Sequence, residues 1–328
     1  MPYVLFLLLL LVSVAHGADQ PAAPPPVEYE TVTAADKALA ARAEDVIARI
    51  GTGVTPGREY ANRLRDDYFV RVYRQLKGEE PARKGELNWP RQSIKQCCDL
   101  AELGPTWPLP PLAKVPRASH APSMSGKLDD PAWKNALTYT GMYAFNAKEP
   151  AASPKMTWKM MWDDKYLYVG FDCEDTDIIA PVMKRDDPVY SADCVEVFLL
   201  PEFRYRTYWE IEASPSGSIY DSVQCKNIDR WGLTTDPAQD VKGLKVALNV
   251  VGKFNHTAPT DKGYTVEFAV PFSELPEYSR AKPRAGQKLH FMLVRLDKNS
   301  DKMTPYAYQP LLAWGHNIWN MAEMELVK

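Results

Sequence analysis

Aspartate and glutamate residues gather in short clusters beyond Ser123, and a pair of carboxyl groups is what many enzymes use to hydrolyse a glycosidic bond. Four clusters stand out: Asp129-Asp130, Asp163-Asp164, Asp172 with Glu174 and Asp175, and Asp186-Asp187. Such catalysis needs two carboxyl groups about 5 to 9.5 Å apart around one sugar. Most of these acids fall at expected turns, where aspartate accepts hydrogen bonds from the local backbone. A glycoside hydrolase with unrecognised catalytic acids therefore stays open only as an alternative.

Other catalytic signatures are missing from the sequence. The histidines form no H-E-x-x-H pair, and neither a G-x-S-x-G elbow nor a G-x-G-x-x-G or P-loop motif is present. A haem-binding redox module is a second alternative, because side chains of the kind that ligate haem iron occur at Met160, Met161, His290 and His316. We expect no required cofactor. Carboxylates at turns would suit structural calcium, but the sequence does not identify its ligands.

Aromatic residues next to polar ones favour a binding surface over a catalytic one. The chain has 9 Trp and 17 Tyr. A sugar ring stacks its apolar C–H face on an aromatic ring, and its hydroxyl groups bond to carboxylates and amides. Five residues offer such groups: Tyr190, Glu196, Glu212, Asn317 and Trp319. They are the candidate carbohydrate-binding residues, although buried Trp rings and solvated acids would give the same pattern.

The residues beyond Ser123 alternate between apolar and polar, which is the two-residue period of β-strands. Segments 156–162 and 166–173 flank Asp163-Asp164-Lys165, a hairpin turn signal. Further strands are expected over 194–199, 208–213, 244–250, 264–270, 289–296 and 313–327. Many short strands with little helix indicate a β-sandwich. We therefore predict that residues 123–328 form a mainly β domain, a two-sheet sandwich of the jelly-roll or immunoglobulin-like kind.

A short helical region, followed by a Pro-rich stretch, precedes this domain over residues 33–122. Thr33 and Asp36 match a helical capping box, and apolar residues continue at helical spacing as far as Ile50. A second helix is expected from residue 55 to Gly78, with an apolar stripe that indicates a packing surface. The role of this region is unknown from the sequence, and a protein partner through these helices is one hypothesis.

The first 17 residues have the pattern of a secretory signal peptide. An apolar run covers 5–14, and small residues stand at Ala15 and Gly17, where a signal peptidase cuts. The run is shorter than the roughly 20 apolar residues that span a bilayer, and a short membrane anchor is the alternative. Residues 18–32 are expected to form a linker rich in Pro and Ala. We therefore predict a secreted protein, extracellular or periplasmic, without membrane contact after signal removal.

The net charge limits the classes of binding partner, and the cysteines bear on disulfide formation. The net charge is −3 and no basic run is present, which argues against nucleic acid and against anionic membranes. Export permits disulfides, and five cysteines leave at least one unpaired. Cys173 and Cys194 fall in neighbouring expected strands, and we predict a disulfide between them.

The order of the strand motifs over residues 123–328 resembles the family 9 carbohydrate-binding modules. The matching segments are Trp133, 161–169 (MWDDKYLYV), 193–199 (DCVEVFL), 208–212 (YWEIE), 263–272 (GYTVEFAVPF), Trp314 and 324–327 (MELV). The resemblance implies a non-catalytic β-sandwich that binds plant polysaccharides of the xylan and cellulose class. It also implies that the module assists glycoside hydrolases, often with structural calcium.

The same resemblance implies roles for individual residues. Two aromatic rings clamp the sugar in the family, and the matching positions here are Tyr190 and Trp319. Glu196 matches a glutamate that contacts sugar hydroxyls, and Asn317 supplies a neighbouring amide. Glu212 lies near the position of an arginine contact, and Tyr190 replaces a tryptophan. These departures imply either a different sugar or a fold that has lost sugar binding.

Overall fold

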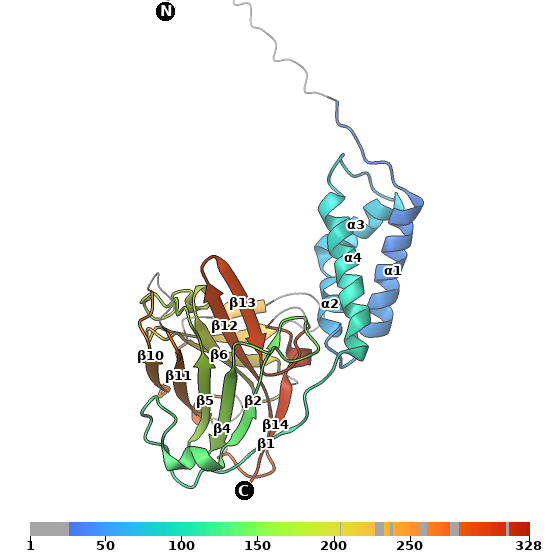
Figure 1. Cartoon of the computed structure of the whole chain (residues 1–328). Coiled ribbons are helices and arrows are strands. Elements are labelled where there is room, and N and C mark those ends of the chain that lie inside the picture. The colour runs from blue at the N-terminus through green and yellow to red at the C-terminus, as the bar shows by residue number, and fades with distance from the viewer. Residues whose placement is uncertain are drawn as a thin grey trace, which may run out of the picture.

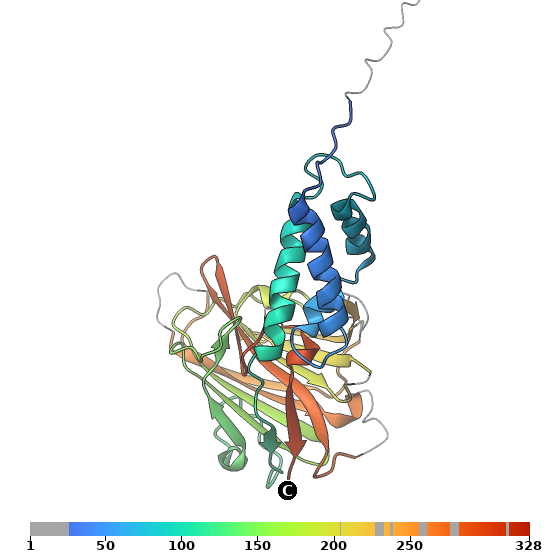
Figure 2. The same ribbon diagram turned by 90° about the vertical axis from the view of Figure 1, so that its right-hand side faces the viewer.

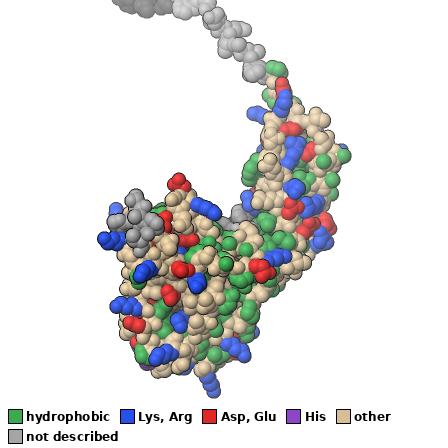
Figure 3. Space-filling model, in the orientation of Figure 1, with side chains coloured by type: hydrophobic (Ala, Val, Ile, Leu, Met, Phe, Trp, Pro, Cys, Tyr) green, Lys and Arg blue, Asp and Glu red, His purple; other side chains and the backbone are tan. Residues whose placement is uncertain are grey.

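The computed structural model describes residues 26–203, 205–226, 233–236, 239–255, 261–275, 282–312 and 315–328. The expected signal peptide, part of the expected linker and Trp314 lie outside these residues. A bundle of helices stands beside a β-sandwich (Figure 1). Basic and acidic side chains are interspersed on the face shown in Figure 3, as the small net charge suggests. No helix in the described part of the chain is long and apolar enough to cross a membrane.

Four helices make up the N-terminal bundle: α1 (Ala34–Ile50), α2 (Arg58–Arg63), α3 (Asp67–Lys77) and α4 (Asn88–Leu103). The capping box at the start of α1 is confirmed, because the Asp36 N–H donates to the Thr33 hydroxyl at 3.2 Å and the Thr33 N–H donates to the Asp36 carboxylate at 2.8 Å. The expected second helix is instead divided into α2 and α3. Asp66 begins α3 by accepting a hydrogen bond from the Tyr68 N–H at 3.0 Å.

The described residues of the sandwich form two sheets. The five-stranded sheet has the order β10 (Lys245–Val251), β11 (Gly263–Pro271), β5 (Tyr166–Glu174), β4 (Met156–Trp162) and β2 (Leu137–Thr140). The nine-stranded sheet has the order β1 (Ala113–Val115), β14 (Ala322–Leu326), β12 (Lys288–Asn299), β6 (Cys194–Leu200), β7 (Thr207–Ala213), β8 (Ile219–Lys226) and β9 (Leu233–Asp236), with β13 (Lys302–Ala307) beside β12 and β3 (Tyr143–Ala144) beside β13. The predicted mainly β sandwich is confirmed, and β1 extends its sheet to residues ahead of Ser123.

One hydrophobic core fills the space between the two sheets. Trp158 and Phe171 from the five-stranded sheet meet Val195, Val197 and Ile211 from β6 and β7, and all five are at most 1% exposed. Because side chains of a strand alternate between its two sides, the residues between these positions point out of the core. The inner face of the nine-stranded sheet is therefore occupied by the core, and polar functional groups can lie only on its outer face.

Figure 2 shows the helical bundle against the sandwich, and buried hydrogen bonds join the two regions. The Tyr60 hydroxyl donates to the Leu312 carbonyl at 2.9 Å, and the Trp107 indole donates to the Pro310 carbonyl at 3.1 Å. Leu312 is fully buried and packs within the apolar core of the bundle. The helical bundle and the sandwich are therefore joined by packed side chains and hydrogen bonds as well as by the connecting chain.

Candidate functional site

The outer face of the nine-stranded sheet, which points away from the five-stranded sheet, carries buried polar side chains. We call it the acidic face and define it by Cys194 and Glu196 of β6, Glu210 and Glu212 of β7, and Tyr220, Ser222 and Gln224 of β8. All seven have at most 8% of their surface exposed, and Cys194, Glu212 and Ser222 are fully buried. The strand register that brings the acids together pairs Glu196 directly with Glu212.

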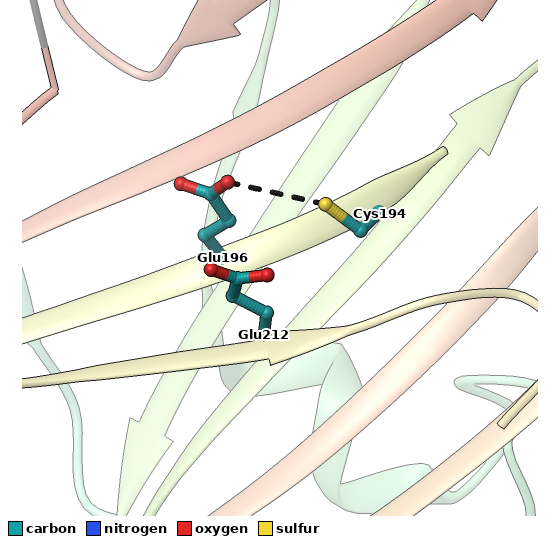
Figure 4. Close-up of side chains that lie close together, drawn as sticks. All are labelled: Cys194, Glu196 and Glu212. Atoms are coloured by element: carbon teal, nitrogen blue, oxygen red, sulfur yellow. Dashed lines mark hydrogen bonds between the residues drawn. The ribbon is translucent and has the colours of Figure 1, made fainter. Parts of the chain in front are cut away.

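Glu196 and Glu212 form the centre of the acidic face, and Cys194 lies beside them (Figure 4). The Cys194 thiol donates to Glu196 Oε1 at 3.9 Å. One ligand atom from each of the three side chains lies within 4.8 Å of the others. Neither carboxylate oxygen of Glu212 makes a hydrogen bond of ordinary geometry with a described residue. A buried carboxylate in that state carries an unrelieved desolvation cost.

Burial controls the protonation of this pair. It raises the pKa of Glu196 well above the usual range, and the charge of Glu210 raises it further. Burial likewise raises the pKa of Glu212, with added repulsion from Glu196 and then Glu210. The backbone N–H of Tyr190 is close enough to act against this rise at Glu212. The two carboxyl groups therefore favour their protonated forms, in which one can donate a hydrogen bond and the other accept one.

Glu210 belongs to a separate hydrogen-bond network on the acidic face. Its carboxylate accepts from the Gln224 amide at 2.5 Å and the Ser222 hydroxyl at 3.5 Å, and His316 Nε2 lies 3.5 Å from its other oxygen. The Tyr208 hydroxyl lies 2.8 Å from Nδ1 of the same histidine. Burial raises the pKa of Glu210 to about 7, against the lowering effect of Gln224 and Ser222.

Tyr190 supplies an exposed aromatic ring next to these acids. It lies on the short helix η3 (Val189–Ser191) and is 51% exposed. Its ring meets that of Tyr220 edge-on, with 6.0 Å between centroids, and Tyr220 is the register partner of Glu212. An exposed ring beside groups that donate and accept hydrogen bonds is suited to stacking on a sugar.

The two predicted residues near the C-terminus lie elsewhere, under the helical bundle. Asn317 is fully buried and its side-chain amide donates to the Pro56 carbonyl at 3.0 Å. Trp319, on η5 (Ile318–Asn320), is 4% exposed, and the Arg58 guanidinium lies 5.2 Å from its ring centroid. The structure thus brings Tyr190, Glu196 and Glu212 together and places Asn317 and Trp319 in the contact between the two regions.

Sequence reasoning missed Glu210, Tyr220 and the role of Cys194 at this face. The signal that could have found two of them is strand alternation. Glu210 is two residues before Glu212, and Cys194 is two residues before Glu196, so each shares a face with a predicted site residue. Tyr220 lies on β8, a strand that the apolar pattern did not predict.

The predicted disulfide between Cys173 and Cys194 is wrong, and all five cysteines are free. Cys173 lies on β5 in the five-stranded sheet and faces the core, whereas Cys194 lies on β6 in the other sheet and faces outward. The two strands follow one another in the sequence, but a sandwich can send consecutive strands to different sheets. The nine-stranded sheet therefore lies between the two thiols.

The side chains considered as haem ligands do not converge. Met160 packs in the core between the sheets, and Met161 packs on the outer side of the five-stranded sheet. His290 and His316 lie on the outer side of the other sheet, each against an aromatic ring, Phe203 and Phe198 respectively. No pair of a methionine and a histidine among these four is placed to hold one iron from two sides.

Two further clusters of acids have oxygen donors of the kind that calcium prefers: Asp175 with Asp193 and Asp297, and Asp186 with Asp221 and Asp240. An arginine already lies in each. Arg295 is 2.9 Å from Asp175 and 3.1 Å from Asp297, and it is fully buried. Arg185 is 2.5 Å from Asp221 and 3.2 Å from Asp240. A guanidinium group therefore takes the position of a cation, and the clusters do not fit a calcium ion in this arrangement.

A two-sheet sandwich with an exposed ring beside a hydrogen-bonding face defines a β-sandwich binding module. Residues 124–323 match the family described as carbohydrate family 9 binding domain-like, and the chain belongs to this family. The resemblance seen in the sequence is thereby confirmed.

Two relatives in sequence and one solved structure are similar to this chain. It is 32% identical over 155 residues to endo-1,4-β-xylanase A of Thermoanaerobacterium saccharolyticum and 31% identical over 156 residues to exoglucanase XynX of Acetivibrio thermocellus. Each match covers 47% of this chain but only 11% and 12% of the relatives, so the chain spans a small part of their length. A Bacteroides uniformis protein provisionally described as carbohydrate-binding matches 66% of this chain and 97% of its own, with 14% identity and a TM-score of 0.50. This likeness supports the fold.

Proposed function

We propose that this protein binds carbohydrate at the Tyr190 edge of the acidic face and is not itself catalytic. The observation that carries the proposal is the half-exposed Tyr190 ring beside Glu196 and Glu212, in a chain of the family 9 binding domains. The apolar face of a sugar would stack on Tyr190. Its hydroxyl groups would reach the edge of the carboxyl pair at Glu196, which keeps 5% of its surface exposed, and the protonated pair can donate and accept hydrogen bonds.

The polysaccharide class follows from the relatives. The two that match are named as a xylanase and an exoglucanase, so the xylan and cellulose class is the first to test. We expect weak binding, with Kd from about 1 μM to 1 mM, or roughly −8 to −4 kcal/mol. Such a module would act outside the cell or in the periplasm as an accessory to hydrolases, in line with the signal-like residues 1–17.

The covered position of Trp319 limits the kind of sugar contact. Of the two rings predicted to clamp a sugar, Tyr190 is open and Trp319 is not, because Arg58 and Pro56 of the bundle cover Trp319 and Asn317. A sugar therefore cannot stack between Tyr190 and Trp319 in this arrangement. We propose that the ligand stacks on a single ring, as a chain end or a short unit would.

Catalysis by Glu196 and Glu212 is the weaker alternative. A glycosidase places its two carboxyl groups on either side of the bond that it cuts. Glu196 and Glu212 instead lie side by side on neighbouring strands of one sheet face, with almost no exposed surface. This geometry suits a hydrogen-bonding pair under one edge of a ligand better than an acid and a nucleophile around it.

The test is calorimetry of the purified chain with xylo-oligosaccharides and cello-oligosaccharides, in buffer with a metal chelator. We expect Tyr190→Ala to weaken binding by about 10-fold or more, since an aromatic stacking contact contributes roughly 0.5–1.5 kcal/mol beyond its buried area. Tyr29→Ala is the matched control, because Tyr29 is 59% exposed on the helical side of the molecule.

Equal affinities in both variants would show that the ligand site is not at Tyr190. A folded protein that binds no sugar of the panel would refute the proposal as a whole. Turnover of a chromogenic glycoside that disappears in Glu196→Gln would replace binding with catalysis.

A further inference from the structure

We infer that Cys194, Glu196 and Glu212 form a binding site for a divalent transition-metal ion, with zinc as the best match. The site lies on the acidic face, at the junction of β6 and β7 (Figure 4). It goes beyond sugar binding, and it shares Glu196 and Glu212 with the proposed sugar contact, so the ion and the metal-free carboxyl pair are alternatives at this place.

The spacing of the three side chains fits one small ion. Cys194 Sγ and Glu196 Oε1 are 3.9 Å apart, and one donor atom of Glu212 lies within 4.8 Å of both. Zinc binds sulfur at about 2.3 Å and carboxylate oxygen at about 2.0–2.2 Å, so tetrahedral ligands of these types lie about 3.6 Å apart. Small side-chain rotations would bring the three donors to that distance. A fourth position remains for water, as in zinc sites with three protein ligands.

The electrostatics of this cluster differ from those of the other two acid clusters. Arg295 and Arg185 pair with the carboxylates there, at 2.5–3.2 Å. No ion pair joins Glu196 or Glu212 to a cation among the described residues, and the neighbouring charges that act on Glu212 are those of Glu196 and Glu210. Ionising these carboxyl groups without a cation costs free energy, and a bound cation would offset that cost, as the arginines do in the other clusters.

The unsatisfied carboxylate of Glu212 is the second observation that points to an ion. Both of its oxygens lack a hydrogen bond of ordinary geometry while the residue is fully buried. Buried polar groups almost always have a partner, and each exception calls for a reason. A metal ion between Glu212 and Glu196 would satisfy one or both oxygens.

The donor set selects the kind of ion. A thiolate with two carboxylates is too soft for calcium or magnesium, which prefer oxygen ligands only. Zinc accepts sulfur and oxygen together, and no redox chemistry is needed to hold it. Binding would release the thiol proton of Cys194 and any proton shared by the carboxyl pair, so affinity should rise with pH.

The experiment uses cobalt as a visible stand-in for zinc, with the full chain carrying Cys225→Ser to remove its exposed thiol. We expect one equivalent of cobalt to give a thiolate-to-cobalt charge-transfer band, and one equivalent of zinc to abolish it. Cys194→Ser in the same background should lose the band. Glu212→Gln should weaken zinc binding by about 10-fold to 100-fold or more, because the loss of even an outer-shell partner of a metal ligand has an effect of that size.

Absence of the band in the Cys225→Ser protein would overturn the inference without any further variant. A band that persists in Cys194→Ser would also overturn it, because the thiolate would then come from another cysteine. Circular dichroism of the metal-free variants checks that each one folds. Sugar binding is measured separately in chelator, so failure of the metal site and failure of the carbohydrate site give different results.

Discussion

Strands β6 and β7 present two faces that follow the same alternation and hold opposite chemistry. Val195, Val197 and Ile211 point inward and are fully buried among apolar neighbours, whereas Glu196 and Glu212 point outward and are nearly as buried. Burial of the inner face stabilises the fold, at about 25 cal/mol per Å² of apolar surface. Burial of the outer acids costs free energy. The fold explains the first face, and only a ligand, a proton or an ion explains the second.

The largest effect is expected on the inner face. Ile211→Ala should lower the free energy of unfolding by about 2–5 kcal/mol, because it leaves a cavity in the core between the sheets. Chemical denaturation measures this change. A loss below 1 kcal/mol would mean that β7 is not packed as described, and the contrast between the two faces would lose its basis.

The next effect concerns pH. Glu210 has its pKa raised by burial from 4.5 to about 7, so folding takes up a proton between these values. Its contribution is therefore complete below pH 4.5 and is lost as the pH rises through about 7, with a slope of at most about 1.4 kcal/mol per pH unit. Burial also raises the pKa values of Glu196 and Glu212, so their contributions to stability fall in the same direction as the pH rises.

Denaturation at several pH values tests this slope. Glu210→Gln should flatten the fall between pH 5 and pH 7 by up to one group's share, about 1.4 kcal/mol per pH unit. The exposed Glu149→Gln is the control and should leave the slope unchanged. An equal slope in wild type and Glu210→Gln would show that this carboxyl group titrates normally in the folded chain.

A smaller change in stability, of opposite sign to that of Ile211→Ala, is expected at Glu212. Glu212→Gln in metal-free protein at neutral pH should raise the free energy of unfolding by about 1 kcal/mol, since it removes a buried and repelled carboxyl group. Saturating zinc should reverse the order, because wild type then gains binding energy that the variant lacks. Destabilisation by Glu212→Gln without metal would mean that this carboxyl group has a stabilising partner in the fold.

The smallest effect is expected at Trp319, which the bundle covers, in contrast to the exposed Tyr190. Arg58→Ala removes the guanidinium that lies 5.2 Å from the Trp319 ring and should lower the free energy of unfolding by about 0.5 kcal/mol. If sugar affinity also rises in this variant, Trp319 belongs to the ligand site once it is uncovered. Unchanged affinity would leave Tyr190 as the ring that binds.

The sequence alone predicted the strands and helices better than it predicted which of them lie next to each other. Alternation identified β6 and β7 and therefore the face to which Glu196 and Glu212 belong. Their pairing across the strands depends on register, which the sequence does not specify. The burial of Asn317 depends on a hydrogen bond to Pro56, 261 residues away. The disulfide prediction failed for a related reason, because consecutive strands β5 and β6 enter different sheets.

Leu312 anchors the sandwich in the core of the helical bundle, and this has a consequence for proteolysis. The stretch between the bundle and β1 is exposed at Leu109 (60%) and Leu112 (39%), so a protease can reach it. After such a cut, Leu312 and the bonds from Tyr60 and Trp107 would still hold the two pieces together. The nicked chain should elute from a sizing column as one particle and separate only in denaturant. The two pieces, made independently, should also find each other as a split protein.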